Sequence, residues 1–245
     1  MPPFAERIAA WRASLGELER WLLPGACLIC DGPVPAREND ALVCALCRSR
    51  WRRVPERCCD RCGQPSFGDL ECRMCATWPA DLARVRSAVW LDDSARRAVH
   101  RLKYEGWWRV SEAMAAAMRD LEPLTGGVSL IPIPLGARRA RERGYNQSER
   151  IAASVSRLTG IPVRTELLRR VRETRTQTAL TPEARQANLA GAFEGAGTDG
   201  LAVVLVDDVF TTGATLVAAA AALRAAGAAR VDGVTFARAL EPVAG

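Results

Sequence analysis

The residue types best suited to chemistry lie in one short run, 203–215, which reads Val-Val-Leu-Val-Asp-Asp-Val-Phe-Thr-Thr-Gly-Ala-Thr. Its four leading apolar residues predict a short buried strand, and two adjacent carboxylates, Asp207 and Asp208, follow. A turn then opens an alanine- and leucine-rich helix, and it consists of Thr211, Thr212, Gly213, Ala214 and Thr215. Backbone N–H groups at a helix N-terminus bind phosphate, and paired carboxylates suit hydroxyls or a divalent metal. A sugar phosphate satisfies both requirements.

A strand, a turn and a helix with a threonine cap are common in α/β proteins, but a structural turn does not need two adjacent negative charges. The run also resembles, without gaps, the signature of the type I phosphoribosyltransferases, which bind phosphoribosyl pyrophosphate. This resemblance implies that Asp207 and Asp208 hold the ribose hydroxyls. It also implies that the threonine-rich turn surrounds the 5′-phosphate.

The composition predicts a globular protein of one or two domains, with 245 residues of which 49% are hydrophobic. We expect no membrane span, because no run of about 18 apolar residues is present. The first residues lack the apolar core of a signal peptide, so we expect a cytoplasmic protein. The formal charge is +6, and Lys103 is the only lysine. This charge is too small to indicate nucleic-acid binding by itself.

All nine cysteines lie in the first third of the chain, and eight of them form C-x-x-C pairs. Two such pairs can bind one zinc ion tetrahedrally. The intervening stretches, 31–43 and 63–71, are short enough for consecutive pairs to share a metal. We therefore expect two structural zinc ions, one on Cys27, Cys30, Cys44 and Cys47, and one on Cys59, Cys62, Cys72 and Cys75. The spacing leaves open a cross-braced pairing, and Cys58 could replace Cys59.

Disulfides and catalytic redox pairs are the alternatives to zinc. A cytoplasmic chain disfavours disulfides, and redox pairs do not usually occur four at a time. Two zinc ions with eight thiolates would lower the net charge to about +2, which weakens an argument for nucleic-acid binding from charge. Between the two expected sites lies the run 48–53, in which four arginines surround Trp51. It either contacts a nucleic-acid backbone and stacks on a base, or it forms a solvated linker with Trp51 packed on a zinc ribbon. We favour the linker.

The chain changes character after about residue 80, where strands and helices alternate. This alternation predicts a parallel, doubly wound sheet, in which ligands bind beyond the carboxyl ends of the strands. The loop 134–147 follows a strand that ends at Ile133, and it carries four arginines, among them Arg138 and Arg143. A pyrophosphate needs such a second anion site. The polar segment 172–190, which includes Arg175, has the length and polarity of either a lid or a surface connection.

From Cys27 to Arg238 the chain resembles the ComF family. The similarity rests on the cysteine pairs, Leu102-Lys103-Tyr104-Glu105-Gly106, Ile133-Pro134, Arg143-Gly144-Tyr145-Asn146-Gln147, the segment with Arg175, Gln177 and Asn188, and the signature at 203–215. It implies an amidophosphoribosyltransferase-like fold preceded by a double zinc ribbon. We therefore expect an amphipathic helix over 1–24, the zinc ribbons over 25–80 and a phosphoribosyltransferase-like domain over 81–241. Members of this family are linked to DNA uptake in natural transformation.

Two functions follow as hypotheses. In the first, the protein binds phosphoribosyl pyrophosphate with Mg²⁺ and transfers the ribosyl group to an unidentified acceptor. Asp207 and Asp208 then act at the sugar, while Arg138, Arg143 and Arg175 bind the phosphates. In the second, the protein is a non-catalytic adaptor that binds single-stranded DNA and other competence proteins. The only histidine, His100, is not assigned a role, because its place in a predicted helix favours a surface position.

Overall fold

The computed structural model describes residues 25–35, 38, 41–65, 72–125, 127–173, 189 and 191–239. The chain forms two compact units that divide between Arg50 and Trp51, within the range predicted for the zinc ribbons. In the first unit, helix α2 (Ala45–Ser49) begins after Cys44, whose sulfur accepts the N–H of Cys47. The helix predicted over 1–24 lies outside the described residues.

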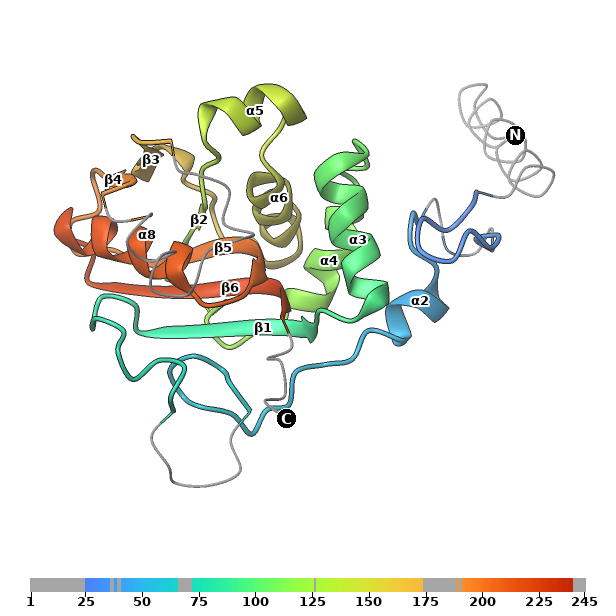
Figure 1. The fold of residues 1–245 in the computed structure, drawn as a ribbon, viewed down its shortest axis with the longest axis horizontal. Coiled ribbons are helices and arrows are strands. Elements are labelled where there is room, and N and C mark those ends of the chain that lie inside the picture. Colours follow the sequence, from blue (N-terminus) through green and yellow to red (C-terminus); the bar gives the residue numbers. More distant parts are fainter. Residues whose placement is uncertain are drawn as a thin grey trace, which may run out of the picture. The chain divides into compact units, whose positions relative to one another are not determined.

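The second unit is built on a four-stranded sheet (Figure 1). Its strands are β1 (Arg84–Trp90), β2 (Ser129–Pro132), β5 (Ala202–Phe210) and β6 (Arg230–Arg238), in the order β1-β6-β5-β2. All neighbours in this sheet are parallel. A separate antiparallel pair joins β3 (Leu168–Arg170) to β4 (Phe193–Gly195). The predicted parallel sheet is therefore confirmed.

Helices lie on both faces of the sheet, as expected for a doubly wound fold. They are α3 (Asp93–Tyr104), α4 (Val110–Met118), α5 (Ala137–Arg143), α6 (Gln147–Thr159) and α8 (Ala214–Ala225), with a 3₁₀ turn η2 at Thr165–Leu167. On one face, α8 packs over Val203 and Leu205. Because side chains alternate along a strand, Val204 and Val206 point to the other face, where α6 contacts β5.

Two elements differ from the sequence-based expectation. Strand β5 does not end before the acidic pair but continues to Phe210, because β6 pairs with it along its whole length. The arginine-rich loop 134–147 contains helix α5, which is made of the good helix formers alanine, arginine and glutamate. Gly144 ends this helix in the left-handed conformation, with φ 74°, and its N–H donates to the carbonyl of Ala140.

The topology brings the two expected anion-binding segments to one edge of the sheet. Neighbouring strands β5 and β2 are parallel, so the turn after Phe210 and the segment after Pro132 both follow carboxyl ends. Helix α6 begins nearby at Asn146, whose side chain accepts the N–H of Ser148 and donates to the carbonyl of Ile133. In the described residues, no helix has both the length and the apolar character needed to span a bilayer. The cytoplasmic location stays a prediction.

Candidate functional site

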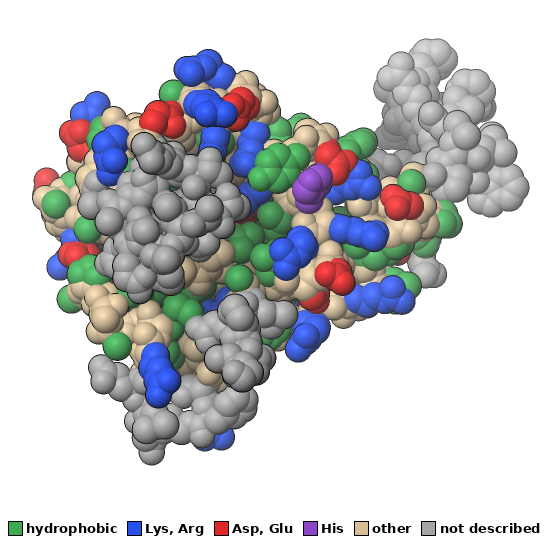
Figure 2. All heavy atoms as spheres, in the orientation of Figure 1, with side chains coloured by type: hydrophobic (Ala, Val, Ile, Leu, Met, Phe, Trp, Pro, Cys, Tyr) green, Lys and Arg blue, Asp and Glu red, His purple; other side chains and the backbone are tan. Residues whose placement is uncertain are grey.

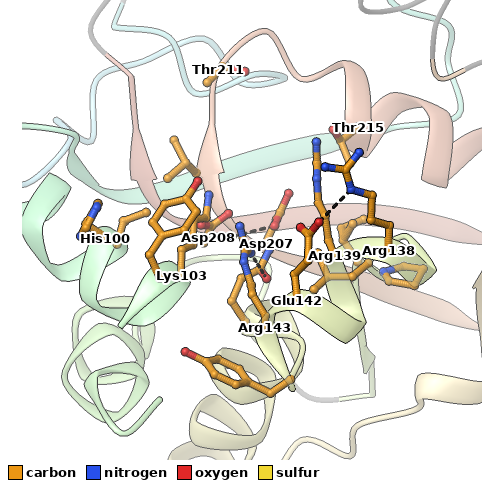
Figure 3. Close-up of a pocket in the computed structure, with 18 of the residues that line it drawn as sticks. His100, Lys103, Arg138, Arg139, Glu142, Arg143, Asp207, Asp208, Thr211 and Thr215 are labelled. Atoms are coloured by element: carbon orange, nitrogen blue, oxygen red, sulfur yellow. Dashed lines mark hydrogen bonds and ion pairs between the residues drawn. The ribbon is translucent and has the colours of Figure 1, made fainter. Parts of the chain in front are cut away.

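A cavity of about 750 Å³ lies at the carboxyl ends of β5 and β2. Its lining comes from the acidic pair on β5, Thr211 and Thr215 beyond it, helix α3 and helix α5 (Figure 3). The structure thus brings together Asp207, Asp208, Arg138 and Arg143, which the sequence placed in separate segments. Figure 2 shows basic side chains gathered over α5 on the face drawn there.

Asp207 is fixed in place by two hydrogen bonds to its Oδ1 atom. The hydroxyl of Ser148 donates to it over 2.9 Å, and so does the N–H of Asp208 over 2.9 Å. Burial and the charge of Asp208 raise the pKa of Asp207 to about 7, against the opposing effect of Lys103. The acidic pair therefore binds a proton near neutral pH, as two interacting carboxylates do.

Asp208 forms an ion pair through its Oδ2 atom with the amine of Lys103, which comes from α3. Only 4% of the Asp208 side chain is exposed. Burial would lower the pKa of Lys103, but attraction to Asp208 and Asp207 raises it above the usual value. Lys103 therefore remains charged and offsets part of the negative charge of the pair.

The turn between β5 and α8 surrounds a second, smaller hollow of about 20 Å³, lined by Asp207 and residues 209–216. Gly213 is the N-cap of α8 and adopts φ 80°, a conformation that glycine reaches without strain. The hydroxyl oxygen of Thr212 accepts the N–H of Ala214 over 3.5 Å. Thr215 lines both the hollow and the large cavity, as do Asp207 and Thr211, so the two spaces adjoin at these residues.

Arg138 and Arg143 line the cavity, and each already interacts with a neighbouring polar side chain. Arg138 is exposed and forms an ion pair with Glu142 over 2.8 Å. Arg143 donates to the side-chain oxygen of Gln147 over 2.6 Å, and its guanidinium lies 5.1 Å from the ring centre of Tyr104. An incoming anion would have to compete with Glu142 for Arg138. Arg175 lies outside the described residues.

Several lining residues were not identified from the sequence as site residues. They are Lys103, Arg139, Glu142, Arg170 and Glu173. Ser148 was missed too, and it acts through its hydrogen bond to Asp207. Two signals were available for Lys103: it is the only lysine in a chain rich in arginine, and it lies in the segment Leu102–Gly106 that carries part of the family resemblance. His100 also lines the cavity, but its side chain is 59% exposed and its Nδ1 lies 2.9 Å from Glu105.

Trp51 packs inside the second unit and does not present its ring to solvent. Its exposed fraction is 5%, and its ring meets that of Phe236 edge-on at 4.9 Å between centroids. Stacking of a nucleic-acid base on Trp51 is therefore excluded in this conformation. The arrangement agrees with the favoured interpretation that Trp51 packs within the protein, although its partner is the sheet.

The C-x-x-C pairs gather as two groups, in which all four sulfurs lie within 4.8 Å of one another. The groups are Cys27, Cys30, Cys44 and Cys47, and Cys59, Cys62, Cys72 and Cys75. A tetrahedral zinc ion with Zn–S bonds of about 2.3 Å requires sulfurs about 3.8 Å apart. The contacts Cys30–Cys44 at 3.9 Å, Cys59–Cys75 at 3.7 Å and Cys62–Cys72 at 3.5 Å agree with that spacing.

The consecutive pairing is thus the one that the structure shows. Among the described residues, which include all nine cysteines, none forms a disulfide. Cys58 belongs to neither group, and its backbone pairs with Pro65 in an isolated bridge. Burial raises the pKa of Cys75 to about 11 and also raises that of Cys62. Zinc binding requires thiolates, so it must displace protons here.

Two family models match the chain. The model of the double zinc ribbon domain matches residues 18–76, and that of the phosphoribosyl transferase domain matches residues 146–243. Between them they include the two cysteine groups and the cavity residues of β5.

Curated relatives match over most of their length. DNA utilization protein YhgH of Escherichia coli strain K12 is 31% identical over 220 residues, which covers 86% of this chain and 95% of that protein. YhgH of Salmonella typhi is 32% identical over 222 residues, with the same coverage. Competence protein ComFC of Bacillus subtilis strain 168 is 29% identical over 234 residues, covering 86% of this chain and 94% of the relative. The chain therefore belongs to the ComF family, whose members join a double zinc ribbon to a phosphoribosyltransferase domain.

Proposed function

We propose that this protein binds phosphoribosyl pyrophosphate with Mg²⁺ in the cavity at the carboxyl ends of β5 and β2. The observation that carries the proposal is that the acidic pair, Thr211 and Thr215 of the threonine-rich turn and the arginines of α5 line one cavity. A ligand with a phosphate at one end, hydroxyls in the middle and a pyrophosphate at the other matches that order of groups. The phosphoribosyl transferase domain model, which includes residues 203–215, supports the same ligand.

In the proposed complex, Asp207 and Asp208 accept hydrogen bonds from the ribose hydroxyls. Their negative charge also stabilises the positive charge that develops at the anomeric carbon when pyrophosphate leaves. The turn residues Thr211–Thr215 donate to the 5′-phosphate. Arg138 and Arg143 bind the pyrophosphate, and we assign Arg175 to the same role. The reaction class is transfer of the phosphoribosyl group to a nucleophile, whose identity the site leaves open.

Calorimetric titration with phosphoribosyl pyrophosphate and Mg²⁺ tests this function. We expect saturable binding to the wild-type chain and at least a tenfold loss of affinity in the double variant Asp207→Asn, Asp208→Asn. Asp232→Asn is the matched control, because Asp232 is also a buried carboxylate but does not line the cavity. Absence of binding to the wild type, or equal affinity in the double variant, would contradict the proposal.

We propose a second function, binding of single-stranded DNA, on a surface that shares Tyr104, Arg143 and Tyr145 with the lining of the cavity. Relatives are named for DNA utilization and for competence, and this supports a role in DNA uptake. The observation that favours DNA is an exposed cluster beside the cavity, which we call the aromatic–arginine surface. It consists of Tyr104, Trp107, Trp108, Tyr145, Arg143 and Arg150.

Three rings of the aromatic–arginine surface are open to solvent, with exposed fractions of 67% for Tyr104, 43% for Trp107 and 39% for Trp108. The guanidinium of Arg150 lies 4.8 Å from the ring centre of Trp108 and 5.9 Å from that of Tyr145. Rings that stack on bases, together with arginines that contact phosphates, are the usual means of binding single strands. This surface therefore replaces the run 48–53 as the candidate DNA site.

Fluorescence anisotropy with a labelled oligothymidine at several salt concentrations tests the surface. The double variant Trp107→Ala, Trp108→Ala should lose about tenfold in affinity, since one stacked base contributes roughly 1–3 kcal/mol. Arg150→Ala should lower the salt slope by about 0.7. Arg119→Ala, an exposed arginine paired with Asp120, is the matched control and should change neither quantity. If Arg52→Ala weakens binding and the tryptophan variants do not, the run 48–53 is the site instead.

A further inference from the structure

Trp78 lies directly against the turn that precedes α8. A Cβ atom placed on Gly213 would come within 2.4 Å of Cζ2 of Trp78 and 3.1 Å of Phe210. The rings of Trp78 and Phe210 also contact each other, with centroids 6.0 Å apart. The bare backbone of Gly213 therefore packs on the indole ring, and the position of that ring limits where the turn can lie.

Trp78 is in turn fastened to the second cysteine group. The backbone N–H of Trp78 donates to the carbonyl of Cys75 over 3.1 Å. Arg61, which lies between Cys59 and Cys62, donates to the carbonyl of Cys75 over 3.2 Å and to that of Trp78 over 3.1 Å. It also donates to the carbonyl of Pro79. Both halves of the second cysteine group are thus bound to the segment that carries the indole ring.

Arg238 provides an independent link between the same cysteine group and the end of β5. Only 1% of this arginine is exposed. It donates to the carbonyl of Cys62 over 2.8 Å and to the side-chain oxygen of Gln64 over 2.7 Å. Its guanidinium lies 4.3 Å from the ring centre of Phe210, the last residue before the threonine turn.

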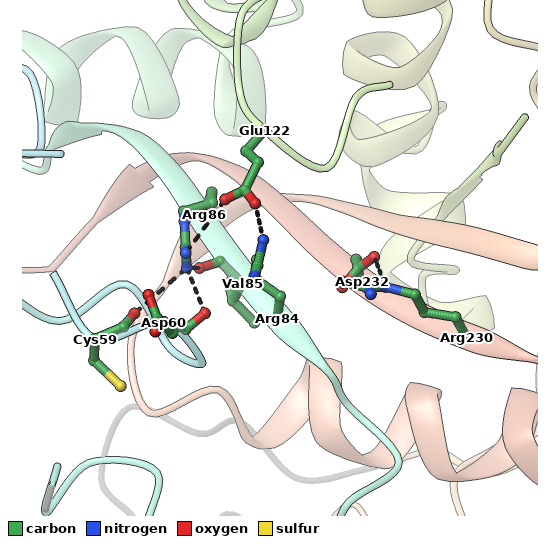
Figure 4. Close-up of polar contacts among 8 residues, drawn as sticks. All are labelled: Cys59, Asp60, Arg84, Val85, Arg86, Glu122, Arg230 and Asp232. Atoms are coloured by element: carbon green, nitrogen blue, oxygen red, sulfur yellow. Dashed lines mark hydrogen bonds and ion pairs between the residues drawn. The ribbon is translucent and has the colours of Figure 1, made fainter. Parts of the chain in front are cut away.

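Strand β1 also contacts residues 59–62, which form the first knuckle of the second cysteine group (Figure 4). Arg86 donates to the carbonyl of Asp60 over 3.0 Å and forms an ion pair with Glu122 over 3.4 Å. Gly63 approaches the strand so closely that a Cβ atom would lie 2.9 Å from the carbonyl oxygen of Val85. The knuckle 59–62 is therefore anchored to the sheet, and Cys75 is joined to it both by the hydrogen bond from Arg61 and by the shared metal-binding group.

We propose that the second cysteine group, when it holds its metal, positions the turn Thr211–Thr215 through Trp78 and Arg238. A metal ion joins Cys75 to the anchored knuckle, and Cys75 is joined to Trp78. Loss of the metal would remove one of the two links that hold the Trp78 segment to the knuckle, the other being Arg61, and would loosen the surface on which Gly213 packs. The identity of the anion at the turn rests on the proposed function, but the coupling between metal and turn does not.

The coupling is reciprocal, because two sites that affect each other's binding must do so by the same factor. Metal at the second cysteine group strengthens anion binding at the turn, and a bound anion strengthens binding of that metal by the same factor. Trp78 and Arg238 are then positioning residues, since they act through the turn and do not line the cavity. The first cysteine group, in the other compact unit, provides an internal control.

Hydrogen exchange of the full chain tests the coupling without any ligand. We expect Cys75→Ser to speed amide exchange at residues 211–217 at least tenfold, while Cys47→Ser leaves it within twofold of the wild type. Trp78→Ala should give the same local effect with both metals retained, and Trp78→Phe should restore most of the protection. If residues 211–217 exchange equally fast in Trp78→Ala and in the wild type, the proposal is overturned. This comparison decides the question even if Cys75→Ser does not fold.

Equilibrium competition for zinc with a chromogenic chelator provides the second readout. Saturating phosphoribosyl pyrophosphate should raise the zinc affinity of one of the two sites at least threefold in the wild type, and should have no such effect in Trp78→Ala. If the wild type does not bind this ligand, the proposed function fails, while the exchange result still decides the coupling. If the ligand binds and the zinc affinities of both sites are unchanged, the coupling is wrong and the proposed function stands.

Discussion

Lys103 and Asp208 form an ion pair on the wall of the cavity, although they come from distant segments, α3 and β5. Lys103 is the only lysine of the chain, and its ammonium group is more compact than the guanidinium groups of the 33 arginines. The acidic pair is therefore paired with a compact cation. The ammonium group neutralises part of the charge of the acidic pair, and Asp207 lines the cavity beside it.

Replacing Lys103 by Met should destabilise the protein, because it leaves Asp208 buried without its cation. We expect the free energy of unfolding to fall by about 2–4 kcal/mol at pH 8. Adding Asp208→Asn should recover most of the loss, since no unpaired charge then remains. Denaturant titration of the two variants measures this difference. A double variant as unstable as the single one would show that Lys103 acts through packing alone.

The pKa of Asp207, about 7 where the ordinary value is 3.8, makes stability depend on pH. The folded state retains a proton that the unfolded state has already lost, so stability falls as the pH rises from about 4 to about 7. Asp207→Asn removes this effect. It should stabilise the protein at pH 8, by at most about 4 kcal/mol, and should give no gain at pH 4. Denaturation at several pH values, with the exposed Asp120→Asn as control, checks the pH dependence.

Ser148→Ala should raise the pKa of Asp207 further, because the hydroxyl of Ser148 donates to the carboxylate that it stabilises. Binding of phosphoribosyl pyrophosphate should then need a higher pH, and affinity at pH 7 should fall by roughly three- to tenfold, the effect of about one hydrogen bond. Calorimetry across pH measures the shift. Ser111→Ala, which removes a buried hydroxyl paired with Ser154, should leave the pH profile unchanged.

Metal analysis should find two zinc ions in each wild-type chain. We expect Cys59→Ser to retain only one, because Cys59 belongs to the second group, and Cys58→Ser to retain both. If the Cys58 variant loses zinc and the Cys59 variant keeps it, the neighbouring thiol is the ligand in solution.

The parts of the site that could be predicted from the sequence are local. Asp207, Asp208 and the threonine turn are adjacent in the chain, so their types and order were enough to indicate a phosphate site. Lys103 could not be assigned, because its role depends on the packing of α3 beside β5. The extension of β5 to Phe210 was missed for a similar reason, since it results from pairing with β6 and not from residue types.

The zinc sites show the same limit. Spacing identified the ligands and favoured the consecutive pairing that the structure shows, but it did not exclude a cross-braced arrangement, because the longer segments between alternate pairs could also bring two pairs to one metal. For Trp51, the sequence offered two interpretations, and only the position of Phe236 in the folded sheet distinguishes them. The helix α5 had a local signal in its alanine, arginine and glutamate content, which the interpretation as a loop overlooked.

The buried guanidinium of Arg238 links the last strand to the second cysteine group. This link limits where recombination between related genes can divide the chain. Recombination near residue 80 would replace the partners of Arg238, Trp51 and Trp78 in one step. The guanidinium of Arg238 would then be buried without its hydrogen-bond acceptors. An exchange between Arg50 and Trp51 breaks none of those contacts. The second ribbon and the sheet are therefore expected to descend together as one unit, while the first ribbon can be gained, lost or swapped.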